Sequence, residues 1–246
     1  CRHKPPAPEF LDLCDSLGFV VIDEAFDKWK SGYYADFFDS SWRQDIGDML
    51  LRDRNHPSIV LWSIGNEVTE AWLKTDEGVQ RAKMLQDFVH RAEPSRMCML
   101  AAQNNFEDKF GEVTDVLGYN YMEPRMVKDH KTFPERRMIV TEAFPYYSGL
   151  HPSAIREYVP RNPWNFVRDN DFIAGSFIWA GAEYIGESEY WPSKGWSAAP
   201  FDMCMDEKPV AFFHRVLWNP DRPMLKMIVC DNVFDMDPGK DHWQYP

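Results

Sequence analysis

Long apolar runs are absent from this sequence. No stretch of its 246 residues approaches the roughly 18 to 20 consecutive apolar residues that a membrane-spanning helix needs. The chain also does not open on the charged and then apolar pattern of a signal segment. We therefore expect a soluble chain without a membrane partner, and the compartment (cytoplasm, periplasm or outside the cell) stays open.

Cysteines are few and follow no pattern. The five cysteines are scattered, odd in number and free of Cys-x-x-Cys spacing. This arrangement predicts neither a disulfide framework nor a zinc site, and it favours buried thiols. No metal ligand and no cofactor are predicted, while a structural or activating divalent or monovalent cation stays open.

Positive charge is also scarce. Lys and Arg number 27 against 39 Asp and Glu, which gives a formal net charge of −12 and a pI near 5.0. Nucleic acid backbones and anionic membranes both attract clustered Lys and Arg, so neither is expected as a partner. A neutral substrate agrees better with this charge.

The remaining composition is that of a folded α/β domain, in which apolar strands alternate with helical segments. Apolar residues recur at three- and four-residue intervals in the helices, whereas the strands are continuous apolar runs. Such strands are typical of a parallel sheet covered by helices on both faces. The predicted helices are 8–17, 37–54, 77–92 and 164–168, and the predicted strands are 19–22, 59–64, 98–101, 116–120, 138–141 and 175–179.

Polar or acidic residues follow most of these strands directly. In a (β/α)8 barrel the carboxyl ends of all strands open on one face, where the active site lies. A doubly wound sheet would concentrate functional groups at a switch point instead. Polar residues after several separate strands favour the TIM barrel. These residues are Asp23, Glu24, Asn66, Glu67, Gln103, Asn104, Asn120, Tyr121 and Glu142.

Two strand-end carboxylates are the strongest candidates for chemistry. Glu67 ends the strand in RDRNHPSIVLWSIGNEV, and Glu142 ends another, in MIVTEAFP, 75 residues later. Two carboxyl groups that face each other over a cleft can hydrolyse a glycosidic bond. One protonates the leaving oxygen while the other attacks the anomeric carbon or activates water. Taken singly, either glutamate would equally be a solvated strand-end carboxylate or an ion-pair partner.

Three segments resemble glycoside hydrolase family 2, the family of β-galactosidases, β-glucuronidases and β-mannosidases. The family's acid/base signature is matched by RDRNHPSIVLWSIGNEV, the segment before it by PPAPEFLDLCDSLGFVVIDEAFD, and its last barrel strand by GSFIWAGAEYIGE. The resemblance implies that Glu67 is the general acid/base at the end of barrel strand four and Glu142 the nucleophile at the end of strand seven. Retention of configuration implies carboxyl groups about 5 to 5.5 Å apart and a covalent glycosyl-enzyme intermediate.

The resemblance also implies sugar contacts. Asn66 is expected at the 2-hydroxyl, and Tyr121 in LGYNYME is expected to support the nucleophile. His3 matches a histidine that contacts the sugar, and Trp179 an indole that forms the floor of the subsite. Without the resemblance, Tyr121 would be an ordinary rim tyrosine and His3 a structural hydrogen-bonding histidine.

Two further carboxylates, Asp23 and Glu187, are candidates to accept a hydrogen bond from the sugar 4-hydroxyl. The Asn-x-Lys pair by which β-glucuronidases hold a carboxylate is not evident, since Lys194 lies in PSKGW without the asparagine. This departure and the negative net charge favour a neutral sugar. A group of charged residues that precedes the Glu67 strand, on the opposite face of a barrel, is interpreted as structural: Arg52, Asp53, Arg54 and His56.

The resemblance also bears on the extent of the barrel. The chain opens without methionine and enters a helix within a few residues. The resemblance implies that the first barrel strand and most of the second are not part of this sequence. A proline-rich link follows Trp218. We expect a partial TIM-barrel catalytic domain over residues 1–217, and a linker with the start of a following domain over residues 218–246.

The sequence therefore predicts a retaining exo-β-glycosidase that hydrolyses terminal β-linked neutral sugars by double displacement, with β-galactosidase favoured. A β-mannosidase or β-glucuronidase of the same family stays open, as does a non-catalytic carbohydrate-binding remnant. The expected partner is a carbohydrate substrate, and a homo-oligomer of the full-length protein stays open.

Overall fold

The computed structural model describes residues 3–68, 76–103, 106, 108–143, 163–186, 195–196 and 199–225. The chain divides into two compact units. The first comprises Cys1–Thr141 and Asn170–Gly175, and the second Glu142–Asp169 and Ser176–Pro246. The predicted domain boundary after residue 217 stays a prediction, and residues 226–246 lie outside the described part.

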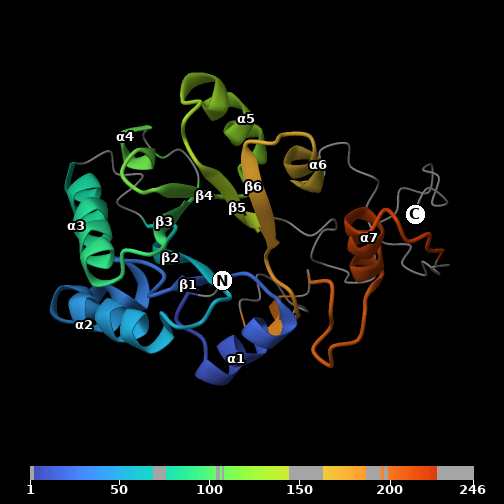
Figure 1. Cartoon of the computed structure of the whole chain (residues 1–246), viewed down its shortest axis with the longest axis horizontal. Helices are drawn as coiled ribbons and strands as arrows, with labels where there is room; N and C mark the ends of the chain where they lie inside the picture. Colours follow the sequence, from blue (N-terminus) through green and yellow to red (C-terminus); the bar gives the residue numbers. More distant parts are fainter. Residues whose placement is uncertain are drawn as a thin grey trace. The chain divides into compact units, whose positions relative to one another are not determined.

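Helices and strands alternate along the first unit (Figure 1). Helix α1 begins at a proline and ends at Gly18, whose φ of 76° is the left-handed conformation that glycine adopts readily. The elements that begin in this unit are α1 (Pro8–Leu17), β1 (Val21–Glu24), η1 (Gly32–Tyr34), α2 (Ala35–Asp53), β2 (Ile59–Asn66), α3 (Asp76–Ala92), β3 (Met97–Ala102), α4 (Asp108–Gly111), β4 (Val116–Asn120), α5 (Glu123–Thr132), β5 (Met138–Ala143) and β6 (Ile173–Ile178).

The strands form one six-stranded sheet in the order of the chain, from β1 to β6. The pairs β1–β2, β2–β3 and β3–β4 are parallel. Parallel neighbours joined by helices are the repeating unit of an incomplete (β/α)8 barrel, which confirms the predicted fold class. The carboxyl ends of these parallel strands lie at the same edge of the sheet.

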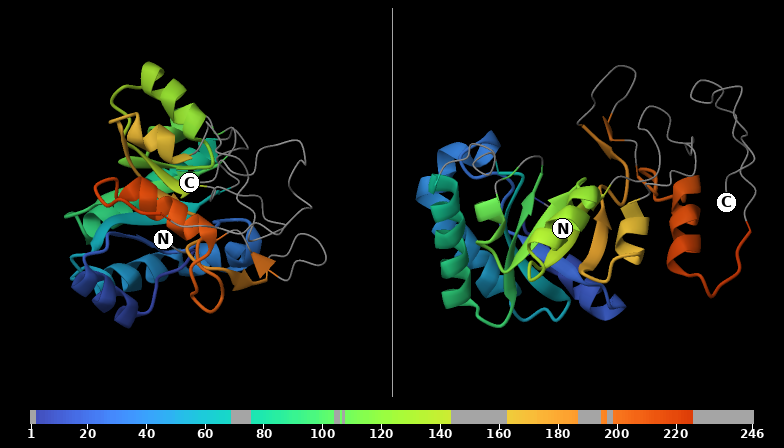
Figure 2. Two further views of the ribbon diagram at one scale, coloured as in Figure 1. Left: turned by 90° about the vertical axis from the view of Figure 1, so that its right-hand side faces the viewer. Right: turned by 90° about the horizontal axis from the view of Figure 1, so that it is seen from above.

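The core of the first unit lies between the sheet and its helices. Helices α2 and α3 lie side by side (Figure 1), with the rings of Trp42 and Phe88 5.5 Å apart edge to face. Helix α3 runs along the strands of this unit (Figure 2). The fully buried Trp62 of β2 donates its indole N–H to Glu93 Oε2 at 2.7 Å, which satisfies its one polar atom.

The predicted strands and long helices all recur in the structure, with ends that differ by a few residues. The sequence reasoning missed η1, α4 and α5, as well as β7, β8 and α7 of the second unit. These elements have two to ten residues, so each carries only a short stretch of the periodicity by which helices and strands are recognised. Two of the free cysteines, Cys14 and Cys98, are buried as expected, but Cys204 is exposed, so the expectation of a buried thiol is wrong there.

The second unit contains the carboxyl ends of β5 and β6, the antiparallel pair β7 (Tyr184–Ile185) and β8 (Gly195–Trp196), and two helices. The helices are α6 (Pro163–Arg168) and α7 (Pro209–Trp218), and Trp164 meets Trp218 edge to face at 6.1 Å. Lys208, which is almost fully buried, pairs with Glu183. None of the helices in the described residues combines the length and the apolar character needed to cross a membrane.

Candidate active site

The carboxyl end of β2 makes a sharp turn that carries Glu67 out of the strand. Gly65 has a φ of 156°, and a Cβ there would lie 2.7 Å from the indole nitrogen of Trp29, so only glycine fits. Trp29 is fully buried and donates to the carbonyl of Ile64 at 2.7 Å. Glu67 itself has a φ of 46°, a left-handed conformation that is uncommon for a residue with a side chain and that is frequent at functional sites.

Polar donors surround the Glu67 carboxylate, and the side chain is only 17% exposed. Asn120 Nδ2 lies 3.0 Å from Glu67 Oε1, and Lys28 Nζ lies 3.9 Å from Glu67 Oε2. The Gln103 amide, turned so that its nitrogen faces the carboxylate, lies 3.2 Å from both oxygens. The Glu67 carboxylate is therefore oriented by side chains from three different segments: Lys28 after β1, Gln103 after β3 and Asn120 at the end of β4.

Asn120, the last residue of β4, holds several of these groups together. Its Nδ2 also donates to Asn66 Oδ1 at 2.9 Å, and its Oδ1 accepts from Thr141 Oγ1 at 2.6 Å. The strand β4 reaches Thr141 closely because residue 118 is glycine: a Cβ there would lie 2.7 Å from two atoms of the Thr141 side chain. The amide of Asn120 therefore has partners on both its nitrogen and its oxygen.

The segment after β1 reaches the same group of residues. The Asp27 carbonyl accepts from the Asn66 amide at 2.7 Å, and Asp27 Oδ1 accepts from Asn66 Nδ2 at 3.0 Å. His3 Nδ1 lies 3.4 Å from Glu24 Oε1 and 3.6 Å from Asp27 Oδ1. The predicted residues His3, Asn66 and Glu67 are thus brought together in the first unit.

Glu24 is the carboxyl of β1 that joins this cluster. It is fully buried and accepts from Ser63 Oγ at 2.6 Å. Burial raises the pKa of the Glu24 carboxyl, although hydrogen bonds with His3 and Ser63 oppose the shift. Its position makes it part of the wall around Glu67, a role that the sequence reasoning had not assigned.

Asp23, which was predicted to contact the sugar, lies elsewhere. Side chains alternate between the two faces of a strand, so Asp23 and Glu24 point to opposite sides of β1. Asp23 is fully buried beside Asp53 of α2, and burial together with that second carboxylate raises the pKa of Asp23 to about 8. The structure therefore does not bring Asp23 into the Glu67 cluster and does not support it as a sugar contact.

The remaining predicted residues are distributed as follows. Tyr121 follows Asn120 directly, is partly exposed and has a φ of 57°, so β4, like β2, is followed by a left-handed residue. In the second unit Glu142 is buried near the end of β5, and the neighbouring Ala143 carbonyl accepts from the Trp179 amide at 3.0 Å. The Trp179 indole donates to the Tyr184 hydroxyl at 3.2 Å. Glu187 lies outside the described residues.

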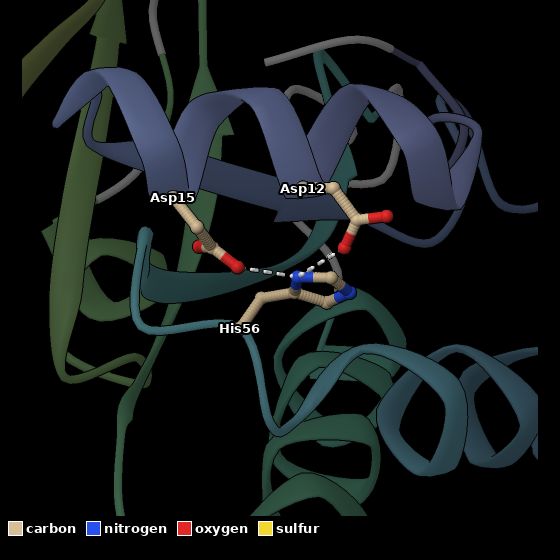
Figure 3. A group of neighbouring side chains, drawn as sticks. All are labelled: Asp12, Asp15 and His56. Carbon is tan, nitrogen blue, oxygen red and sulfur yellow. Dashed lines mark hydrogen bonds and ion pairs between the residues drawn. The ribbon is translucent and has the colours of Figure 1, made fainter.

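A possible metal-binding group lies at the amino end of β2, away from Glu67. Figure 3 shows that Asp12 and Asp15 of α1 both point toward His56, in the loop before β2. Asp15 Oδ2 is 2.7 Å from His56 Nδ1, and Asp15 Oδ1 accepts from the Ser58 amide at 2.8 Å. Because these bonds already join α1 to the loop, we assign the group a structural role, in agreement with the interpretation of His56 from the sequence.

The neighbouring charged residues have structural contacts as well. Arg52 forms two bonds to Asp53, at 2.6 and 2.7 Å, and donates to the Pro6 carbonyl at 2.7 Å. The Arg54 carbonyl accepts from Arg96 at 2.9 Å. These contacts join the end of α2 to the segment before α1 and to the residue before β3, and they contribute no group to the Glu67 cluster.

Several residues of the cluster were missed by reasoning from the sequence, namely Glu24, Asp27, Lys28, Ser63 and Thr141. Glu24 and Asn120 had been noted as strand-end polar residues, but without a role. The signal that would have chosen Glu24 over Asp23 is the phase of the strand relative to its helices. Asp27 and Lys28 lie in a loop, where side-chain periodicity gives no direction.

Comparison with known proteins decides the family. Residues 1–180 match the TIM barrel domain of the glycosyl hydrolases family 2. The chain belongs to glycoside hydrolase family 2. This confirms the resemblance found in the sequence and places the strand that ends at Glu67 within the matched domain.

Individual relatives in this family carry different names. A β-galactosidase of Bacteroides ovatus, BoGH2A, is 32% identical in an alignment that covers 100% of this chain and 37% of that protein. A β-glucuronidase of Bacteroides fragilis is 24% identical over 91% of this chain and 36% of its own length. A crystal structure of a family 2 member from Bacteroides cellulosilyticus matches 99% of this chain and 32% of that one, with 30% identity and a TM-score of 0.77. The chain thus spans about a third of the length of these relatives.

Proposed function

We propose that this chain carries the catalytic barrel of a retaining exo-β-glycosidase that acts on terminal β-linked neutral sugars, with β-galactosides as the first choice. The observation that supports this most directly is the setting of Glu67. Glu67 has a left-handed backbone conformation directly after a barrel strand. Its carboxylate lies among the amides of Asn120 and Gln103 and the ammonium of Lys28. The placement suits a group that reacts from the strand-end face of a barrel.

In the proposed reaction Glu67 begins as a carboxylic acid and Glu142 as a carboxylate. Glu142 forms a bond to the anomeric carbon while the glycosidic C–O bond breaks and Glu67 gives its proton to the leaving oxygen. In the second step Glu67, now a carboxylate, takes a proton from water as the water oxygen attacks the anomeric carbon and the bond to Glu142 breaks. The reaction as proposed balances without a cofactor.

Asn66 is proposed to contact the sugar 2-hydroxyl. Its backbone and its side-chain nitrogen are fixed by Asp27, and its Oδ1 is fixed by Asn120. Because both polar atoms of the Asn66 side chain are fixed, it can bind a hydroxyl group without first changing its conformation. Such a preorganised group favours interactions that strengthen in the transition state. Trp179 of the second unit is proposed as an apolar platform for the sugar ring.

The charge of the cluster supports a neutral rather than an anionic sugar. The first unit gathers the carboxyl groups of Glu24, Asp27 and Glu67 around one lysine, Lys28, and one histidine, His3. A sugar carboxylate that entered this setting would lose its hydration and gain little positive charge in return. A β-glucuronidase, like the relative from Bacteroides fragilis, is therefore the less favoured alternative.

The test of the proposed function compares hydrolysis of the nitrophenyl β-D-galactoside, β-D-mannoside and β-D-glucuronide by the full-length protein. We expect kcat/KM for the galactoside to exceed that for the glucuronide at least about tenfold, a difference of about 1.4 kcal/mol. A preference for the glucuronide would contradict the neutral-sugar assignment and leave the glycosidase assignment in place. Lack of turnover of all three, with retained binding of the free sugars, would favour a carbohydrate-binding remnant instead.

Variants test the two roles. We expect Glu142→Gln to abolish turnover of every substrate. Glu67→Ala is expected to slow phenyl glycosides far more than dinitrophenyl glycosides, because the better leaving group departs without a proton. Azide should restore activity to Glu67→Ala as a replacement nucleophile in the second step. Equal losses on both substrates in Glu67→Ala would contradict the acid/base role.

A further inference from the structure

Lys28 is held beside Glu67 by contacts that an ordinary surface lysine does not have. Its Nζ lies 2.8 Å from Asp27 Oδ1, 3.5 Å from the Asn66 carbonyl and 3.9 Å from Glu67 Oε2. The side chain is only 25% exposed. The ammonium therefore sits between a carboxylate of the β1 loop and the carboxylate at the end of β2.

The backbone around Lys28 is fixed on both sides. The residue before it, Asp27, accepts the Asn66 amide at 2.7 Å, and the residue after it, Trp29, donates its buried indole N–H to the Ile64 carbonyl at 2.7 Å. Two hydrogen bonds thus join residues 27 and 29, on either side of Lys28, to the last residues of β2. Because the loop is packed in this way, the Lys28 ammonium lies beside Glu67.

Lys28 and Asn120 contact different oxygens of Glu67. Lys28 lies near Oε2 and Asn120 donates to Oε1, so the two side chains together define the plane of the carboxyl group. The titratable groups that the described part of this unit places around them are Asp27 and, farther along the hydrogen bonds, His3 and Glu24. Two of these three groups are carboxyls, so without Lys28 the charge around Glu67 would be dominated by acidic groups.

We propose that Lys28 is a positioning residue for the reaction assigned above, acting through Glu67. Its ammonium orients the Glu67 carboxyl and stabilises the carboxylate that remains once Glu67 has given its proton to the leaving group. Lys28 transfers no proton in either step of the proposed reaction. This inference rests on the proposed function, and it adds the residue that makes proton departure from Glu67 favourable.

The experiment compares Lys28→Met, Lys28→Arg and the control Lys30→Met. Lys30 lies two residues away in the same loop but pairs with Asp39 of α2. Each full-length variant is assayed on the phenyl and dinitrophenyl glycosides of the sugar that the wild-type protein hydrolyses fastest. Thermal unfolding of each variant shows whether it is folded.

For Lys28→Met we expect kcat/KM on the phenyl glycoside to fall about ten- to fiftyfold and on the dinitrophenyl glycoside less than about threefold. Lys28→Arg keeps a cation at this position and should recover most of the activity on the phenyl glycoside, and Lys30→Met should resemble the wild type.

A double variant separates this inference from the function on which it rests. In a Glu67→Ala background, Lys28→Met should have no further effect on the dinitrophenyl glycoside, because Lys28 acts through Glu67. If Glu67→Ala discriminates between the two substrates as expected but a folded Lys28→Met loses activity on both equally, or Lys28→Arg is no more active than Lys28→Met, the role of Lys28 is overturned and the function stands. If the wild-type protein hydrolyses no glycoside, both are overturned.

Discussion

Asn120 lies between Asn66 and Glu67, with its Nδ2 2.9 Å from Asn66 Oδ1 and 3.0 Å from Glu67 Oε1. The Thr141 hydroxyl donates to Asn120 Oδ1. This bond fixes the orientation of the amide, with its nitrogen toward Asn66 and Glu67. The proposed acid/base and the proposed sugar contact are thus oriented by one side chain from a different strand. A buried polar network of this kind is stable only while every member has a partner.

The first prediction concerns this bridging amide. Asn120→Ala should lower kcat/KM on aryl glycosides about tenfold, because Glu67 and Asn66 each lose a donor. Asn120→Asp should lower it about a hundredfold, because acceptor oxygens would then face Asn66 Oδ1 and Glu67 Oε1. The exposed Asn219→Ala serves as the control, with kcat/KM unchanged. Equal activity of the Ala and Asp variants would contradict the role of Asn120 as a donor.

Much of the fold could be predicted from the sequence because its strands are continuous apolar runs of four or more residues. Ile59–Asn66 and Met138–Ala143 were both expected with nearly the observed bounds. The short η1 and α4 could not be expected, since three or four residues form only about one helical turn and show no repeating pattern. Their conformation depends on the packing of the residues that flank them.

The candidate site could be predicted only in part, for a similar reason. Glu67 was found because the segment before it resembles a family signature and because it ends a strand. Asp23 was chosen because it ends a strand, but the side of β1 on which it lies depends on how the strand packs against its helices, which is a tertiary contact. Lys28 reaches the site only because Trp29 anchors its loop, which is a tertiary contact.

The second prediction concerns Gly118 in β4. An alanine Cβ there would lie 2.7 Å from Thr141 Cγ2 and Oγ1, and Thr141 is a β-branched side chain with little freedom to turn. Gly118→Ala should therefore displace Thr141 from Asn120, lower the free energy of unfolding by about 1 to 3 kcal/mol and lower kcat as well. Unfolding in urea and steady-state kinetics would measure both effects.

Gly175 in β6 is the matched control for that change. A Cβ at this position meets no atom of the described residues within 4 Å, so Gly175→Ala should leave both the stability and the activity close to wild type. A Gly118→Ala variant that behaved like Gly175→Ala would show that the close approach of β4 to Thr141 is unimportant.

The third prediction separates Asp15 from Asp12 at the amino end of β2. Asp15 accepts hydrogen bonds from both His56 and Ser58, whereas Asp12, with a side chain 72% exposed, lies 3.9 Å from His56. Asp15→Ala should lower the Tm by about 2 to 4 °C, while Asp12→Ala should leave it nearly unchanged. A metal site that needed both carboxylates would instead give similar losses, which added chelator would remove.

Acid should weaken the same junction. Burial tends to raise the pKa of the Asp15 carboxyl, but the hydrogen bonds with Ser58 and His56 outweigh it and leave that pKa below its ordinary value. A depressed carboxyl pKa stabilises the fold above the pKa of the unfolded chain and ceases to do so as the pH falls through the folded value. The difference in Tm between the wild type and Asp15→Ala should therefore shrink below about pH 4.

The fourth prediction concerns Asp23, whose carboxyl group is fully buried beside that of Asp53. Burial first, and the neighbouring Asp53 second, raise the pKa of Asp23 to about 8 from an ordinary value of 3.8. Between these two pKa values the folded state holds a proton that the unfolded chain has released. The free energy of unfolding therefore falls as the pH rises through this window, by at most about 1.4 kcal/mol per pH unit for one such group.

Asparagine is neutral at every pH, so Asp23→Asn removes that slope. We expect the wild type to lose stability between about pH 5 and pH 8 relative to Asp23→Asn, and the variant to be the more stable of the two at pH 8. Asp48→Asn replaces an exposed carboxylate of α2, the helix that carries Asp53, and should leave the wild-type slope unchanged. Urea unfolding at a series of pH values measures the three slopes. Parallel curves for the wild type and Asp23→Asn would mean that Asp23 is ionised in the folded protein, and that Arg52, which also faces the Asp23–Asp53 pair, compensates both charges.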